Sequence, residues 1–166
     1  KPAIDPAAWT GAEMAGRADW IYELTASDIA ALGDLAKRLR KTVGDTPDAI
    51  LAIDPAAIDR GAFAAPMAEI FDQIKDGRGF HLVRGLPAAD WDRIDLAIAY
   101  WAIGLRIGAP LSNNPDGDMI GHVTDMWLDY EDPNHRGYQT SAHMLFHCDQ
   151  CDVVSLLCLQ TAKSGG

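Results

Sequence analysis

A change of pattern at Pro110 most constrains what this chain can fold into. Before it, three segments repeat apolar residues at intervals of three and four, which is the spacing of an amphipathic helix. After it, turn-forming stretches alternate with short apolar runs that favour β-strands. The sequence therefore predicts a mostly β fold with flanking helices, of the α+β class.

The ends of these segments are also marked in the sequence. Ser27 and Asp28 are good helix-capping residues, Pro66 is a favoured first-turn residue, and glycines follow each helical pattern. Glycines also bracket the apolar run that reads as the first strand. The predicted helices span 25–44, 66–77 and 87–108, and the predicted strands span 80–84, 119–123, 146–149 and 152–159.

Composition narrows the class of protein. The 166 residues are 48% hydrophobic and 23% charged, which suits one domain with a buried core. The net charge of −10 argues against a nucleic-acid-binding surface, because phosphate contacts need clustered Lys and Arg. No apolar run reaches the ~20 residues that span a membrane, and the N-terminus lacks a signal-peptide core. We expect a cytoplasmic protein whose three cysteines are reduced.

Domain organisation follows from the same patterns. Residues 1–24 carry Trp9, Trp20 and Tyr22 among small residues, which predicts an irregular N-terminal arm that docks through its aromatic rings. Residues 25–166 would form the helical flank and first strands of a single domain. The last residues resemble a strand exit and a glycine turn, so we expect the domain to be truncated at its C-terminal end.

The candidate metal-binding residues lie in the segment Phe146-His147-Cys148-Asp149. In an extended strand, residues i and i+2 point to the same face, so His147 and Asp149 can offer a nitrogen and an oxygen to one metal. These are two of the three ligands of a 2-His-1-carboxylate iron site. The third ligand would be a histidine far along the chain.

Three segments together carry a family resemblance: GFHLVRGLP (79–87), RGYQT (136–140) and LLCLQTAKSGG (156–166), around the His-Cys-Asp triplet. In order and spacing they resemble the taurine dioxygenase-like (TauD/TfdA-like) family of Fe(II)- and 2-oxoglutarate-dependent oxygenases. The resemblance runs from about residue 77 to residue 166. It differs from the common family pattern in having Cys148, where the middle residue is often Thr.

The resemblance implies a double-stranded β-helix, or jelly roll, incomplete in this chain. It implies Fe(II) held by His147 and Asp149, with 2-oxoglutarate as cosubstrate and O2 as oxidant. The implied reaction hydroxylates or otherwise oxidises a small molecule and releases succinate and CO2. The distal iron-binding histidine and the arginine that binds 2-oxoglutarate would lie beyond Gly166. Candidate substrate contacts are Asn113, Asn114 and His143.

Two other interpretations remain open from the sequence alone. The first is a small zinc-binding protein that uses His143, His147, Cys148 and Cys151 as ligands, although strand alternation turns Cys148 away from His147. The second is a non-catalytic jelly roll that binds a ligand or partner, with His147 and Asp149 merely hydrogen-bonded. The sequence does not identify the substrate. It also does not fix the oligomeric state, and a homo-oligomer is one of the states left open.

Overall fold

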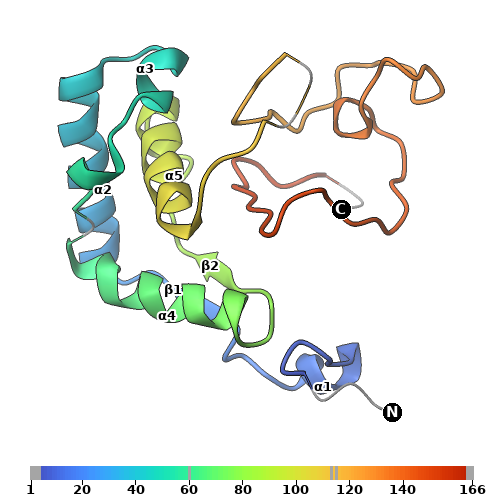
Figure 1. The fold of residues 1–166 in the computed structure, drawn as a ribbon, viewed down its shortest axis with the longest axis horizontal. Helices are drawn as coiled ribbons and strands as arrows, with labels where there is room; N and C mark the ends of the chain where they lie inside the picture. The colour runs from blue at the N-terminus through green and yellow to red at the C-terminus, as the bar shows by residue number, and fades with distance from the viewer. Residues whose placement is uncertain (1–4, 60, 113, 115, 164–166) are drawn as a thin grey trace. The chain divides into compact units, whose positions relative to one another are not determined.

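The computed structural model describes residues 5–59, 61–112, 114 and 116–163 (Figure 1). The chain divides into two compact units, one formed by residues 1–107 and 157–166 and the other by residues 108–156. The first unit contains most of the regular secondary structure, and the second contains the His-Cys-Asp triplet.

Helix α2 (Ala26–Val43) begins with a reciprocal cap. The Thr25 hydroxyl accepts a hydrogen bond from the Asp28 backbone N–H at 3.2 Å, and Asp28 Oδ2 accepts one from the Thr25 N–H at 2.8 Å. These contacts satisfy amide groups that have no partner within the helix. The helix ends at Gly44, whose φ of +93° suits a residue without a Cβ. The predicted helix over 25–44 is confirmed.

The other two predicted helices are confirmed with shifted starts, as α4 (Ala64–Lys75) and α5 (Arg93–Ile107). α5 starts later than predicted because residues 87–90 form a turn, in which the Asp90 N–H donates to the Pro87 carbonyl at 3.0 Å. Asp92 Oδ1 then accepts from the Ile94 N–H at 2.9 Å and serves as a cap.

A two-stranded parallel sheet joins β1 (Ile21–Glu23) to β2 (Leu82–Arg84), with Ile21 opposite Leu82. β2 falls inside the strand predicted over 80–84, which is confirmed. The sequence did not predict β1, because a three-residue strand is too short to show an alternating pattern. The other elements among the described residues are short. They are helices α1 (Gly11–Ala15) and α3 (Pro47–Leu51), and 3₁₀ turns at Pro55–Ala57, Gly61–Phe63 and Gly137–Gln139.

The core of the first unit forms where α2, α4 and α5 turn their apolar faces inward. α2 and α5 lie side by side (Figure 1), and Leu32, Phe63 and Ile98 are fully buried or nearly so. Tyr22 of β1 contacts the Phe63 ring, with ring centroids 6.2 Å apart. Burial of large side chains of this kind is the main favourable term in folding.

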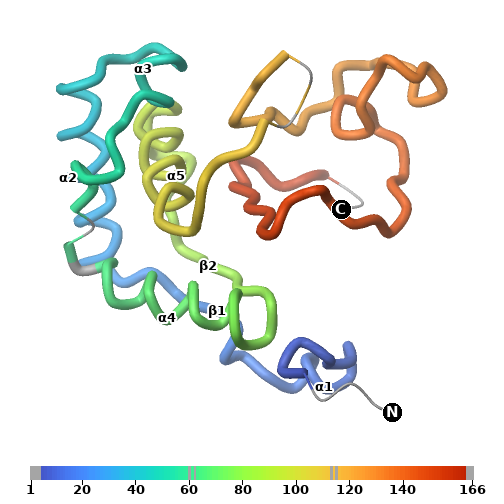
Figure 2. Tube along the Cα trace, in the orientation of Figure 1, coloured from blue at the N-terminus to red at the C-terminus, as the bar shows by residue number. Residues whose placement is uncertain are grey.

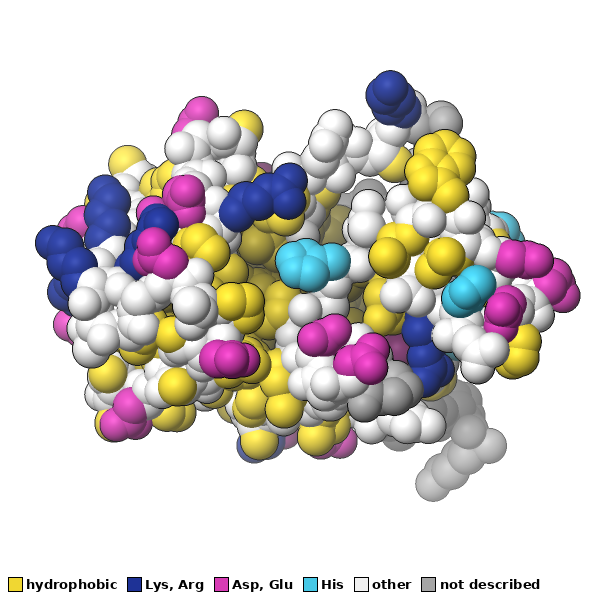
Figure 3. All heavy atoms as spheres, turned by 90° about the horizontal axis from the view of Figure 1, so that it is seen from above, with side chains coloured by type: hydrophobic (Ala, Val, Ile, Leu, Met, Phe, Trp, Pro, Cys, Tyr) yellow, Lys and Arg dark blue, Asp and Glu magenta, His cyan; other side chains and the backbone are white. Residues whose placement is uncertain are grey.

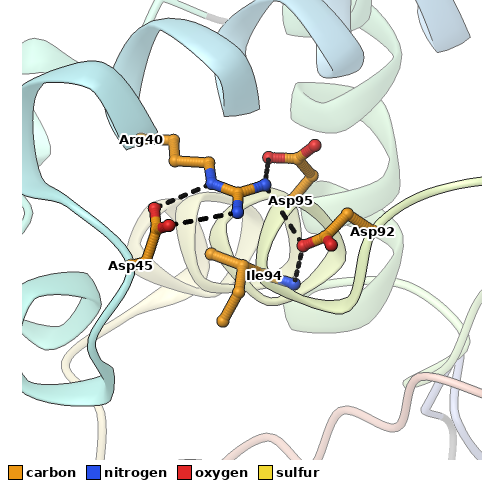
Figure 4. Close-up of polar contacts among 5 residues, drawn as sticks. All are labelled: Arg40, Asp45, Asp92, Ile94 and Asp95. Atoms are coloured by element: carbon orange, nitrogen blue, oxygen red, sulfur yellow. Dashed lines mark hydrogen bonds and ion pairs between the residues drawn. The ribbon is translucent and has the colours of Figure 1, made fainter.

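A cluster of charged side chains around Arg40 connects α2 with α5 (Figure 4). Arg40 of α2 donates to Asp45 at 2.8 and 3.2 Å, and to Asp92 and Asp95 at 3.1 Å each. The hydrogen bonds with Asp45 and Asp95 raise the pKa of Arg40 further above its already high ordinary value. Asp95 belongs to α5 and Asp92 immediately precedes it, so this one guanidinium connects the two helices.

The second unit follows an irregular path (Figure 2), and neither its described residues nor residues 157–163, which follow it in the chain, contain a β-strand. The strands predicted over 119–123, 146–149 and 152–159 are therefore wrong for this structure. The nearest approach to a ladder is a pair of backbone bonds, from Thr124 N–H to Tyr138 O at 3.2 Å and from Met126 N–H to Gln139 O at 2.8 Å. The expected jelly roll stays a prediction.

Large apolar side chains of the second unit remain at the surface. Trp127 is 90% exposed and Phe146 is fully exposed, and Trp127 has a positive φ of 60°. Figure 3 shows hydrophobic side chains among charged ones on the face that it draws. A surface of this kind is typical of a region that packs against further polypeptide or a ligand. Across the described residues, no helix is long and apolar enough to cross a membrane.

Candidate functional site

His147 and Asp149 lie close together in the second unit. Nε2 of His147 is 3.9 Å from Oδ1 of Asp149, and both side chains are about half exposed. The segment that holds them belongs to no strand and has bends at Phe146 and Gln150, yet the two side chains still lie near each other. Their polar atoms are accessible from solvent.

A backbone carbonyl orients the imidazole. Nδ1 of His147 lies 2.8 Å from the carbonyl oxygen of Leu145. A carbonyl oxygen only accepts hydrogen bonds, so Nδ1 carries the proton in this contact, and Nε2 of the neutral ring keeps its lone pair. Metal-binding histidines commonly donate their second ring N–H to such a group. The nitrogen that faces Asp149 is therefore the one available to a metal.

The pair fits two adjacent positions of a metal site. Two ligand atoms at right angles around a metal with bonds of about 2.1 Å are about 3.0 Å apart, somewhat less than the 3.9 Å observed here. Both side chains are about half exposed, so little packing opposes a rotation that would shorten this distance. A nitrogen and a carboxylate oxygen are donors that Fe(II) accepts. Among the described residues, however, no three His, Cys, Asp or Glu side chains gather into a metal site.

Comparison with known proteins decides the family. Residues 53–166 match the family described as "Taurine catabolism dioxygenase TauD, TfdA family", which covers more than half of the chain. The chain belongs to this family. The family resemblance seen in the sequence is thus confirmed, and the matched residues include both His147 and Asp149.

Two curated TauD/TfdA relatives align with almost the entire chain. FR-33289 synthase of Streptomyces rubellomurinus is 26% identical over 170 residues, an alignment that covers 100% of this chain and 48% of the relative. Taurine hydroxylase-like protein SAT17 of Stachybotrys chartarum is 24% identical over 174 residues, covering 98% of this chain and 43% of the relative. The chain thus spans about half the length of the curated relatives it matches.

The zinc-site interpretation is not supported by the arrangement of its four residues. His143, His147, Cys148 and Cys151 all lie in the part of the chain that the structure describes, and no three of them come together. Each cysteine is a free thiol. A structural zinc site needs four ligands at bonding distance, so this constellation does not form one.

The three candidate substrate contacts, Asn113, Asn114 and His143, do not share one environment in the structure. Asn113 lies outside the described residues. The Asn114 side chain serves its own loop, since Oδ1 accepts from the Asp116 and Asp118 N–H groups at 3.1 Å and Nδ2 donates to Asp118 Oδ2 at 2.7 Å. His143 is exposed, four residues before His147. The role of all three in binding substrate stays a prediction.

Two residues just before β2 have buried polar atoms that carry no functional signal in the sequence: Arg78 is buried, and His81 is partly buried. Arg78 is 9% exposed, and its Nε is buried without a hydrogen-bond partner among the described residues. Both ring nitrogens of His81 are also buried without a hydrogen-bond partner among the described residues. Burial lowers the pKa of His81. In the sequence both look like ordinary residues around a strand. Only the fold reveals that they are covered.

Proposed function

We propose that this chain supplies the first part of the active site of an Fe(II)/2-oxoglutarate-dependent dioxygenase. The observation that supports this most directly is the pairing of His147 Nε2 with Asp149 Oδ1 inside the segment that matches the TauD/TfdA family. The reaction would hydroxylate or otherwise oxidise a small molecule. The names of the two relatives, a synthase and a hydroxylase-like protein, agree with an enzymatic role.

In this proposal His147 and Asp149 hold the iron. The Leu145 carbonyl keeps the Nδ1 proton in place, so that Nε2 is free to bind, and the carboxylate of Asp149 neutralises part of the metal charge. Iron(II) with 2-oxoglutarate would supply the oxidation of an unreactive C–H bond by O2, with release of succinate and CO2. Retention of the carboxylate at position 149 favours oxygenation, because related halogenases replace it with a small residue.

The rest of the architecture is part of the same proposal. The complete domain would be a jelly roll, in which the helices of the first unit flank the sheets. A third histidine and a 2-oxoglutarate-binding arginine would come from polypeptide that follows residue 166. The apolar side chains exposed in the second unit are consistent with strands that gain partners there.

An anaerobic titration tests the proposal. The natural full-length polypeptide is titrated with Fe(II) in the presence of 2-oxoglutarate, and the weak visible charge-transfer band of the chelate is recorded. The band should appear in the wild type and in His135→Ala, a histidine whose Nδ1 lies 2.8 Å from the Asp129 carbonyl. His147→Ala and Asp149→Ala should lose it. A well-folded wild type that shows no band would instead support a non-catalytic jelly roll.

A further inference from the structure

Two cysteines flank the carboxylate of Asp149 and have no role in the proposed iron site. Cys148 directly precedes Asp149, and Cys151 follows it by two residues. Both are free thiols, Cys148 being exposed and Cys151 partly exposed. Position 148 is often Thr in the common family pattern, so this Cys-x-x-Cys pair is not a general feature of the family. Both residues are accessible to a small oxidant in solvent.

The path of the backbone favours an approach of these two cysteines. On an extended strand, Cα atoms three residues apart are separated by about 10 Å, whereas the two Cα atoms of a disulfide are usually about 4.4–6.8 Å apart. The chain instead bends at Gln150, Cys151 and Asp152. A tight turn holds residues i and i+3 within about 7 Å of each other, which overlaps the range for a disulfide. The bend therefore shortens the separation that a paired strand would impose.

No regular hydrogen-bond ladder opposes the closure of such a bridge. Residues 146–156 lie in no helix or strand of the described chain. Only Asp149 and Gln150 separate the two cysteines, and the entropy cost of closing a loop falls as the loop shortens. A disulfide that is exposed to solvent is also readily reduced, because exposed or strained disulfides have the more oxidising potentials. These properties favour a bond that forms and breaks reversibly.

We propose that Cys148 and Cys151 form a reversible oxidative-modification site, at which hydrogen peroxide converts the two thiols into an intramolecular disulfide. The more exposed Cys148 attacks one peroxide oxygen, the O–O bond breaks, and the products are a sulfenic acid and water. The Cys151 sulfur then attacks the Cys148 sulfur, the S–O bond breaks, and a second water leaves. The two sulfur atoms together lose two electrons, which reduce the peroxide to water.

The bridge encloses Asp149 in its ring, and the consequence of this for iron rests on the proposed function. Asp149 Oδ1 lies 3.9 Å from His147 Nε2, and the two atoms have to move closer together to share a metal. A ring that fixes the backbone on both sides of Asp149 restricts that movement. Oxidation should therefore weaken Fe(II) binding, and reduction should restore it.

Mass spectrometry of the natural full-length polypeptide tests the disulfide without any metal. The metal-free protein is treated with hydrogen peroxide, alkylated with iodoacetamide in denaturant and digested with trypsin. Cys148, Cys151 and Cys158 all fall within one tryptic peptide, residues 137–163. After oxidation only Cys158 should be alkylated, and dithiothreitol added before alkylation should return the label to all three. Labelling of Cys148 and Cys151 despite the peroxide, or their irreversible oxidation to sulfinic acid, would overturn the proposal.

A pair of serine variants locates the bridge. A bridged peptide is recognised by a mass about 2 Da below that of the same peptide with free thiols. Cys158→Ser keeps both thiols of the proposed site and should form this peptide as fully as the wild type. Cys148→Ser removes one of them and should not form it. A bridged peptide that persists in Cys148→Ser, or disappears in Cys158→Ser, would show that Cys158 is a partner and would overturn the proposal.

The titration with Fe(II) and 2-oxoglutarate separates this inference from the proposed function. After removal of the peroxide, the charge-transfer band should be weaker in the bridged wild type than in the reduced protein, and it should return after reduction. Peroxide-treated Cys148→Ser should keep its band. An unchanged band in the fully bridged wild type would overturn the effect on iron. A reduced wild type without any band would contradict the proposed function, and the mass measurement would still decide whether the disulfide forms.

Discussion

The two units of this chain differ in how their backbone N–H and C=O groups are hydrogen-bonded. In the first, helices α2, α4 and α5 make their hydrogen bonds within one segment, and Phe63 and Ile98 are fully buried between them. In the second, apolar segments that favour strands run unpaired, and Trp127 and Phe146 are exposed. A helix needs only itself for its backbone bonds, whereas a strand needs a neighbour. The helical part therefore satisfies its backbone hydrogen bonds within itself, and the described strand-favouring segments of the second unit do not.

The largest expected contrast is in amide hydrogen exchange. Amides of α2 and α5 should be protected up to the free energy of global unfolding, roughly 5–15 kcal/mol in a typical domain, while most amides of 120–156 exchange nearly freely. Exchange followed by mass spectrometry of peptides measures both regions in one sample. Comparable protection of residues 146–156 would break the contrast and would support the strands predicted from the sequence.

A matched pair of phenylalanines sharpens the comparison. Phe63→Ala empties a fully buried position and should lower the free energy of unfolding by about 3–5 kcal/mol. Phe146→Ala changes a fully exposed side chain and should alter it by less than about 0.5 kcal/mol. Urea unfolding followed by circular dichroism at the helix band gives both values. A large cost at Phe146 would mean that this residue is buried in solution.

The smallest of the three effects depends on pH and belongs to the first unit alone. Burial of Asp28 raises its pKa, but hydrogen bonds from Thr25 and Tyr22 outweigh this and hold the pKa below its ordinary value of 3.8. The ionised carboxylate therefore stabilises the fold above that pH, and this contribution is lost as the pH falls through the lowered pKa.

Asp28→Asn tests this assignment. The variant should be less stable by about 1–2 kcal/mol at pH 7, and the difference from wild type should shrink in acid. Unfolding in urea at several pH values between neutral and strongly acidic supplies the measurement. A difference that stays constant across this range would show that the charge of Asp28 contributes nothing.

Part of the candidate site was predictable from the sequence. The spacing of His147 and Asp149 predicts that they lie close together, and the structure places their polar atoms 3.9 Å apart. The reason proposed for it, a position on a paired strand, is wrong for the described residues. The Leu145 carbonyl that orients His147 carries no sequence signal, because every residue has a carbonyl.

Local patterns by themselves determined the three long helices, one strand and the closeness of His147 and Asp149 in this TauD/TfdA chain. Each depends on residues a few positions apart, so periodicity, caps and spacing are sufficient. Tertiary structure alone decided that Arg78 and the ring nitrogens of His81 are buried, that β1 pairs with β2, and that Trp9 docks on the turn after α4. These features join segments tens of residues apart, and their energies depend on which surfaces meet.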